Sequence, residues 1–377
     1  MQSLWFSVYG RVLILVTTLA LLFSACAPIA PPPAPLAPDP ASITPAITPA
    51  ITVTDALGRT VTLPRPPERV ALTGRGLFMI ADAIYLFPEA GSRIVGMGQT
   101  NQGSSNFVEL IDPDYAQKAA LEREAGAEQI AALQPDLVLM KSALAESLGQ
   151  PIEAIGLPVV YVDFETPAQY ARDLDILGQI FQNPARAQEV AGIYAEKAAQ
   201  IQNAVAGAAL PRTLLLYYND RDGVVAFNVP PLNWIQTEMV QMAGGDPVWA
   251  DANLGGGWTQ VTLEQIAAWD ADQIFVVSYL KDSAQVVAGL LADPNWQALR
   301  AAQAGALHAF PGDLYSWDQP DVRWILGLTW LAGRLHPDRF PDLDIFSEVE
   351  SFYATFYGLD AAFVEQNIRP TFQGDLP

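Results

Sequence analysis

The sequence predicts an α/β protein in which two similar lobes with parallel sheets are joined by a long helix. Short apolar runs alternate with helix-length segments through most of the chain, as expected for parallel strands covered by helices. One helix–strand unit occurs twice. Between the two copies, the pattern from Pro167 to Ala206 is helical and is broken only at Asn183-Pro184.

The first 26 residues predict an export signal. Arg11 supplies a positive charge, and a mostly apolar run from Val12 to Phe23 follows it and leads into Ser24-Ala25-Cys26. Small residues before a cysteine resemble the lipobox of bacterial lipoproteins, in which the cysteine is acylated. The alternative is an uncleaved N-terminal anchor helix. Both interpretations place the protein outside the cytoplasm and attach it to the membrane.

Residues 27–50 predict an extended tether. The segment is dominated by Pro and Ala, has almost no charge and shows no periodicity, so it cannot pack a core. The folded part is therefore expected to start near Ile51. With 51% apolar residues among 377, the chain can bury full hydrophobic cores.

Charge and cysteine content exclude several classes of function. The net charge of −21, from 41 acidic and 20 basic residues, gives no basic surface for nucleic acid. A single cysteine excludes an intrachain disulfide framework and a multi-cysteine metal site. No glycine-rich ATP-binding motif and no nucleophile elbow is present. His308 and His336 form neither a metal cage nor a catalytic pair, so we expect no metal site, no catalytic residue and no bound cofactor.

The folded part should begin with a hairpin, because residues 51–63 alternate apolar and polar positions around Leu57-Gly58. Strands and helices then alternate. The predicted strands are Val70–Leu72, Ile94–Met97, Leu137–Met140, Val159–Val162, Thr213–Tyr217, Ile274–Val277 and Ala306–Phe310, and the predicted helices include Phe78–Phe87, Glu128–Leu133, Glu146–Ile155 and Trp324–Leu335.

The repeated unit is the most informative feature. The segment from Glu128 to Ser142 and the segment from Glu264 to Ser278 agree at seven of fifteen positions. In both, an acidic first turn opens a short helix that leads into an apolar strand. Two copies of one helix–strand unit indicate two lobes of similar architecture.

Four motifs together resemble the class III periplasmic binding proteins, which carry ferric siderophores, haem, cobalamin and, in some members, oxyanions. The motifs are Thr54-Asp-x-x-Gly58-Arg-x-Val61, Pro67-Glu-Arg-Val70, the first-lobe G-x-E-Q-I-A-A-L-x-P-D-L-V, which has a partly matching second copy starting at Thr262, and Tyr315-Ser-Trp-Asp-Gln-Pro320. The resemblance implies two Rossmann-like lobes joined by a single long rigid helix. It divides the folded part into a first lobe at 51–166, the interlobe helix at 167–183, a second lobe at 184–340 and a C-terminal helical extension at 341–377.

Glu128 and Glu264 open equivalent helices, where a carboxylate interacts favourably with the helix dipole. Thr262 and Gln265 also fit a capping box. The resemblance implies a second role, because one glutamate on each lobe of these proteins pairs with arginines of the membrane permease. We therefore expect Glu128 and Glu264 to serve permease docking.

Ligand contacts are expected where strands end, because open α/β sheets bind ligands at the carboxyl edge. Cationic side chains at such positions suggest an anionic ligand or chelate, and Tyr or Trp could pack on a planar one. The predicted ligand-binding residues are Arg75, Gln99, Asn101, Lys141, Tyr217, Tyr218, Trp258, Tyr279, Trp317 and Arg323.

The resemblance predicts the extracytoplasmic substrate-binding subunit of an ABC importer. It would hold a metal chelate (ferric siderophore, haem or corrinoid) between the lobes and deliver it to a permease dimer coupled to an ATPase. One alternative is the same role for molybdate or tungstate. Another is an extracytoplasmic enzyme or chelatase-like protein on the same architecture.

Overall fold

The computed structural model describes residues 50–99, 106–221 and 223–376, which belong to a folded unit spanning 48–377. The export signal, Cys26 and nearly all of the tether lie outside the described residues, as does Asn101. The predicted hairpin is confirmed: β1 (Ile51–Thr54) pairs antiparallel with β2 (Thr60–Leu63). Asp55 closes the turn, because its carboxylate accepts the backbone N–H groups of Leu57 and Arg59.

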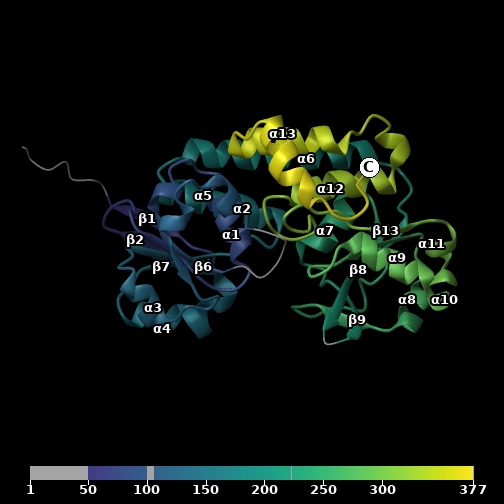
Figure 1. The fold of residues 1–377 in the computed structure, drawn as a ribbon, viewed down its shortest axis with the longest axis horizontal. Helices are drawn as coiled ribbons and strands as arrows, with labels where there is room; N and C mark the ends of the chain where they lie inside the picture. Colours follow the sequence, from purple (N-terminus) through teal and green to yellow (C-terminus); the bar gives the residue numbers. More distant parts are fainter. Residues whose placement is uncertain (1–49, 100–105, 222, 377) are drawn as a thin grey trace, which may run out of the picture. The chain divides into compact units, whose positions relative to one another are not determined.

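The first lobe contains a five-stranded, wholly parallel sheet in the order β5-β4-β3-β6-β7 (Figure 1). Four of its strands match the predicted apolar runs, which are buried because helices cover both faces. The short strand β5 was not predicted. The strands are β3 (Val70–Leu72), β4 (Ile94–Gly98), β5 (Ala119–Leu121), β6 (Leu137–Lys141) and β7 (Val159–Val162).

Four α-helices belong to the described part of the first lobe. In Figure 1, α3 and α4 lie on the other side of the sheet from α1 and α2. The smaller apolar core lies on the α3–α4 side and contains Ile130, Met140 and Ile152. The helices are α1 (Leu77–Ile84), α2 (Phe107–Ile111), α3 (Ala127–Ala132) and α4 (Gln150–Ala154).

The single long helix that the fold class predicts is present, but it lies after the predicted bounds of 167–183, which enclose a shorter helix. Helix α5 (Pro167–Ile180) contacts β1, whereas the longer α6 (Pro184–Val205) contacts α7 (Ile235–Met242) and α12 (Trp324–Leu335) of the second lobe. Asn183 accepts the Arg186 N–H and Pro184 follows it, so a new helix starts there. The helix that reaches the second lobe is therefore α6.

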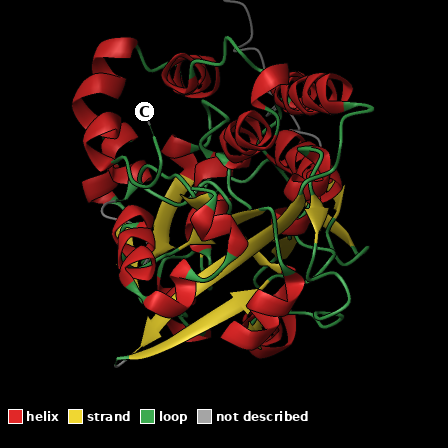
Figure 2. Ribbon diagram, turned by 90° about the vertical axis from the view of Figure 1, so that its right-hand side faces the viewer, coloured by secondary structure: helices red, strands yellow, loops and turns green. Residues whose placement is uncertain are grey.

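The second lobe contains a mixed sheet in the order β11-β9-β8-β12-β13, with β10 beside β8. The predicted strands β8, β12 and β13 are parallel, but β9 and β11 run antiparallel to their neighbours. Figure 2 shows helices around these strands. The strands are β8 (Arg212–Arg221), β9 (Val224–Val229), β10 (Asp246–Pro247), β11 (Thr259–Val261), β12 (Gln273–Val277) and β13 (Leu307–Ala309).

The second lobe ends in a helical extension, as predicted. In Figure 1, α8 and α10 lie on the far side of this lobe from α12 and α13. After α13 the chain returns across the ends of β12 and β13. The remaining helices are α8 (Leu263–Trp269), α9 (Ser283–Ala292), α10 (Pro294–Gln297), α11 (Arg300–Gln303), α13 (Ile345–Tyr357) and α14 (Ala361–Phe363). Among the described residues, no helix has the length and apolar character needed to span a bilayer.

Candidate functional site

The carboxyl ends of three first-lobe strands converge on one set of charged residues. The segment Gly74–Gly76 follows β3, Lys141 ends β6, and Glu165 follows β7. The Lys141 ammonium donates to the Glu165 carboxylate, and Gly76 lies beside the Lys141 side chain. A βαβ sheet brings strand ends together at one edge, so these neighbours arise directly from the parallel order.

Two contacts join this edge to the second lobe. The Ile235 N–H at the start of α7 donates to the Glu165 carbonyl oxygen over 3.1 Å. The rings of Phe78 in α1 and Tyr315 in the loop after β13 stack with centroids 4.3 Å apart. The first-lobe strand ends are therefore in direct contact with the start of α7 in the second lobe.

Four second-lobe rings form what we call the aromatic cluster: Tyr217, Trp234, Trp258 and Tyr279. Tyr217 stacks on Tyr279 at 4.5 Å between centroids and lies 5.0 Å from Trp258, which meets Trp234 edge-on at 5.7 Å. All four are partly exposed. The structure thus brings together three predicted residues and adds Trp234, which the sequence analysis missed. Partly exposed rings at strand ends can pack on an apolar or planar ligand.

A buried carboxylate fixes one ring of the cluster. The Tyr279 hydroxyl donates to Asp318 over 2.7 Å, and Ser316 donates to the other Asp318 oxygen over 2.6 Å. Burial raises the pKa of Asp318, while these donors oppose the rise. Asp318 therefore positions Tyr279.

Tyr218 does not join the aromatic cluster, contrary to the prediction. Successive side chains of a strand point to opposite faces, so Tyr218 lies across the sheet from Tyr217. It packs edge-on against Phe227 at 5.9 Å, and the Lys281 ammonium lies 6.0 Å from its ring.

The predicted cationic residues are all paired with carboxylates. Arg75 pairs with Glu124, Lys141 with Glu165, and Arg323 with three aspartates. Lys281, which also follows a strand, pairs with Asp220. The structure therefore does not support the inference from these bases to an anionic ligand.

Arg323 is the core of a buried ionic cluster that joins the lobes. Its side chain is 0% exposed. Its Nη1 lies 2.7 Å from Asp82 of α1 and 2.9 Å from Asp321, and its Nε lies 2.8 Å from Asp313. The guanidinium also lies 4.7 Å from the Phe107 ring. Arg323 is thus enclosed by protein, which corrects its assignment as a ligand contact.

Trp317 is also enclosed, because α12 packs directly on the loop that contains it. A Cβ at Gly327 would come within 2.3 Å of the Trp317 carbonyl oxygen, so only glycine permits this approach. The Trp317 side chain is fully buried, which removes it from the ligand contacts. Gln99 remains exposed just after β4.

The ionic cluster predicts a pH dependence of stability. Burial raises the pKa of Asp82 to about 6 and that of Asp321 to about 7, although Arg323 lowers both. A carboxyl with a higher pKa in the folded state stabilises below its unfolded pKa, near 3.8 here. That contribution is lost as the pH rises to 7. Between pH 4.5 and pH 8, the free energy of unfolding of Asp321→Asn should therefore fall by roughly 2–4 kcal/mol less than that of the wild type.

Chemical unfolding at pH 4.5 and pH 8 measures the effect. We expect the wild type to lose more stability than Asp321→Asn over this interval. The exposed Asp338→Asn variant should behave as the wild type. Equal losses in the wild type and Asp321→Asn would show that Asp321 does not hold a proton in the folded state.

A cavity of about 360 Å³ opens at the carboxyl edge of the second sheet. It is bounded by the loop after β12, the loop after β13 and residues 370–373. Tyr279 of the aromatic cluster forms part of its wall. Within the described residues, no group of three or more histidine, cysteine, aspartate or glutamate side chains is arranged to hold a metal ion.

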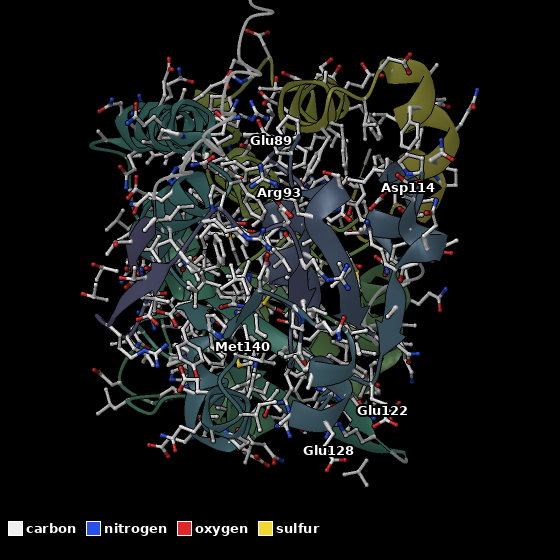
Figure 3. The ribbon with its side chains drawn as sticks, turned by 90° about the vertical axis from the view of Figure 1, so that its left-hand side faces the viewer. Glu89, Arg93, Asp114, Glu122, Glu128 and Met140 are labelled. Carbon is white, nitrogen blue, oxygen red and sulfur yellow. The ribbon has the colours of Figure 1, made fainter. Side chains whose placement is uncertain are left out.

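Glu128 and Glu264 occupy the predicted equivalent positions. Both are exposed in the first turn of their helices, α3 and α8. Figure 3 shows Glu128 at the periphery of the first lobe, far from Glu89 and Arg93. Thr262 and Gln265 form the predicted capping box, which fixes the start of α8. Among the described residues, neither glutamate makes a salt bridge.

The family model for periplasmic binding proteins matches residues 86–314, which is more than half of the chain. The chain belongs to the periplasmic binding protein family. It is a solute-binding component of an ABC transporter and acts outside the cytoplasm. This agrees with the two α/β lobes, the α6 connection and the strand-end residues described above.

Relatives of this chain within the family are named for different ligands. The molybdate-binding protein MolA of Haemophilus influenzae is 26% identical over 337 residues, covering 81% of this chain and 90% of MolA. A vitamin B12-binding protein of Yersinia pestis is 29% identical over 152 residues, covering 40% of this chain and 51% of that protein.

A solved structure of a periplasmic solute-binding protein from Veillonella parvula shares the fold. Its TM-score is 0.67 at 23% identity, and the match covers 85% of this chain and 97% of that one. The predicted fold class is therefore confirmed.

Proposed function

We propose that this protein captures a metal chelate, such as a ferric siderophore, haem or corrinoid, and delivers it to an ABC permease dimer. The observation that supports the proposal is the aromatic cluster of Tyr217, Trp234, Trp258 and Tyr279 at the strand ends of the second lobe. Four partly exposed rings offer a broad apolar wall, which suits the organic body of a chelate. The negative faces of these rings are unfavourable for a small, strongly hydrated anion.

The charges at the same edge support this choice. A site for a free oxyanion needs donors or cations that are not already neutralised. Arg75, Lys141 and Lys281 each pair with a carboxylate, and Arg323 is enclosed. We infer that the ligand is bound mainly by packing and by neutral hydrogen bonds.

An oxyanion ligand is the second candidate, and one finding favours it. The molybdate-binding protein MolA matches 81% of this chain, twice the share that the vitamin B12-binding relative matches. For molybdate to bind here, Arg75 or Lys141 would have to leave its carboxylate partner for the anion.

A thermal-shift panel separates the two candidates. A ligand that binds only the folded state raises the melting temperature, and the rise grows with the logarithm of the ligand concentration divided by the dissociation constant. We expect a shift with ferrichrome, haemin or cyanocobalamin and none with molybdate or tungstate. Shifts with the oxyanions alone would refute the proposal, and chemical conversion of a bound chelate would favour an enzyme instead.

We propose that Glu128 and Glu264 dock the protein on its permease. Both are exposed, and they open equivalent helices on the two lobes. Changing both to alanine should leave ligand affinity unchanged while lowering ligand-stimulated ATPase activity of the reconstituted importer several-fold, since charge pairs steer and orient association. The exposed pair Glu146→Ala and Glu350→Ala is the matched control. Full activity of the Glu128/Glu264 variant would exclude this role.

We further propose that Cys26 bears a lipid anchor, which rests on the run of apolar residues before Ser24-Ala25-Cys26 and the Pro-rich segment after it. Cys26→Ala should leave the signal unprocessed or release the protein from membranes. Fractionation together with the mass of the mature protein provides the measurement. Unchanged processing and mass in the variant would contradict the proposal.

A further inference from the structure

The cavity at the carboxyl edge of the second sheet is partly built by the end of the chain. Pro370, Thr371, Phe372 and Gln373 line it opposite Tyr279 and Gln319. We call residues 370–376 the C-terminal segment. The cavity therefore depends on a part of the chain that follows the last long helix.

The C-terminal segment is fixed by backbone contacts. Gly312 and Gln373 exchange two backbone hydrogen bonds of 3.3 and 2.9 Å, and the Asp375 N–H donates to the Ala309 carbonyl over 2.9 Å. The Trp330 indole N–H donates to the Asp375 carbonyl over 3.0 Å. At Gly374, φ is +77° and an added Cβ would meet the Phe310 carbonyl at 2.5 Å. These hydrogen bonds fix the position of the segment, which forms one wall of the cavity.

Two polar side chains that line the cavity, Gln319 and Tyr315, have no hydrogen-bonding partner among the described residues. Gln319 is 3% exposed, and its backbone N–H and C=O are both bonded within its own loop. Its side-chain amide makes no hydrogen bond to any residue that the structure describes. The amide lines the cavity, where it can both donate a hydrogen bond to a ligand and accept one from it.

Among the described residues, the cavity has no cation that is free to bind an anion. The Lys281 ammonium is paired with Asp220. Asp282 accepts the N–H groups of Ala284 and Gly374 over 2.9 and 3.1 Å. The groups left to a ligand are an amide, hydroxyls and aromatic faces, which suit a neutral carboxamide or hydroxyl better than a carboxylate.

We propose that this cavity is a subsite for a neutral, amide- or hydroxyl-bearing side group of the bound chelate, with Gln319 as its hydrogen-bonding partner and the C-terminal segment as its wall. The inference rests on the proposed function. Tyr279 connects the two parts of the site, because it stacks on Tyr217 and also lines the cavity. The body of the chelate lies on the aromatic cluster, and one side group enters the cavity.

The subsite discriminates among chelates by their peripheral groups. Cyanocobalamin bears primary amides, ferrichrome is a neutral hydroxamate chelate, and haemin bears two carboxylates. A carboxylate would enter a cavity that has no free cation to balance it and that already contains Asp282, so haemin should bind more weakly. For the same reason, a cyanocobalamin derivative with one amide hydrolysed to a carboxylate should bind less well than cyanocobalamin itself.

Two variants test the subsite by calorimetry with cyanocobalamin and ferrichrome. Gln319→Leu removes the amide at nearly constant volume and should weaken binding about tenfold. Thr371→Phe fills the cavity from the C-terminal segment and should weaken it at least tenfold. Gln303→Leu, at an exposed position on α11, is the matched control and should change nothing. Melting temperatures without ligand establish that the variants fold.

The outcomes separate the subsite from the function on which it rests. If the wild type binds a chelate and both variants bind it equally well, the subsite is wrong and the proposed function stands. If haemin binds more tightly than both neutral chelates, the assigned ligand class is wrong. If none of the three chelates binds, both proposals fail.

Discussion

Replacing Arg323 by methionine should lower the free energy of unfolding by about 3–5 kcal/mol at pH 8. The guanidinium is 0% exposed and balances Asp82, Asp313 and Asp321, which would be left as buried carboxylates without a cation. Asp82 belongs to α1 of the first lobe, whereas the other two belong to the loops before α12. The loss should therefore weaken the contact between the lobes as well as the second lobe itself.

Chemical unfolding at two pH values measures this prediction. The loss should be smaller at pH 5, because the raised pKa values of Asp82 and Asp321 allow both carboxyls to be protonated when the cation is absent. Arg300→Met is the matched control, since Arg300 is exposed and pairs with Asp270 and Asp272 at the surface. That change should lower the free energy of unfolding far less, because exposed ion pairs are screened by solvent. If Arg323→Met lowered the free energy of unfolding as little as Arg300→Met does, Arg323 would not be the residue that stabilises the buried ionic cluster.

The second large effect concerns Trp258. Truncation to alanine should weaken chelate binding by about 2–4 kcal/mol, or roughly 30- to 1,000-fold, as expected for a tryptophan at the centre of a binding surface. Trp258 contacts Tyr217 at 5.0 Å and Trp234 at 5.7 Å between ring centroids, so its loss removes the middle of the aromatic cluster. Because the ring is partly exposed, the free protein should lose little stability.

Calorimetric titration with the chelate that gives the largest thermal shift provides the measurement. Trp269→Ala is the control, because Trp269 is a partly exposed tryptophan at the end of α8 outside the cluster. Equal affinity in the wild type and Trp258→Ala would remove the aromatic cluster from the binding site.

The elements that sequence analysis located best are those that the fold buries on all sides. Strands β3 and β7 and helix α12 begin and end at the predicted residues, because a run of apolar residues that helices cover on both faces leaves little ambiguity. Strand β9 was missed because it is partly exposed and follows the polar end of β8, which has no apolar alternation. The helix break at Asn183-Pro184 was seen, but its consequence for the interlobe connection was not.

The candidate site was only partly predictable for a physical reason. The strand-end rule located Tyr217, Trp258 and Tyr279, which the fold brings into contact. Trp234 was missed because it follows a segment without strand or helix pattern, and only its place before α7 brings it to the cluster. The sequence alone does not show which carboxylates pair with an arginine, so Arg323 was interpreted as a free cation. For Arg323, one of them is Asp82, which lies 241 residues away in the sequence.

Competition calorimetry tests the central claim, that the site takes a chelate by packing and neutral hydrogen bonds, most directly. The wild-type protein is titrated with cyanocobalamin and with ferrichrome, first alone and then with excess molybdate, at low and at high salt. We predict that at least one of the two chelates binds, that molybdate does not compete with it, and that its affinity changes little with salt, since no unpaired charge is involved. Displacement of the chelate by molybdate, or binding of molybdate alone with an affinity that falls as salt rises, would contradict the account.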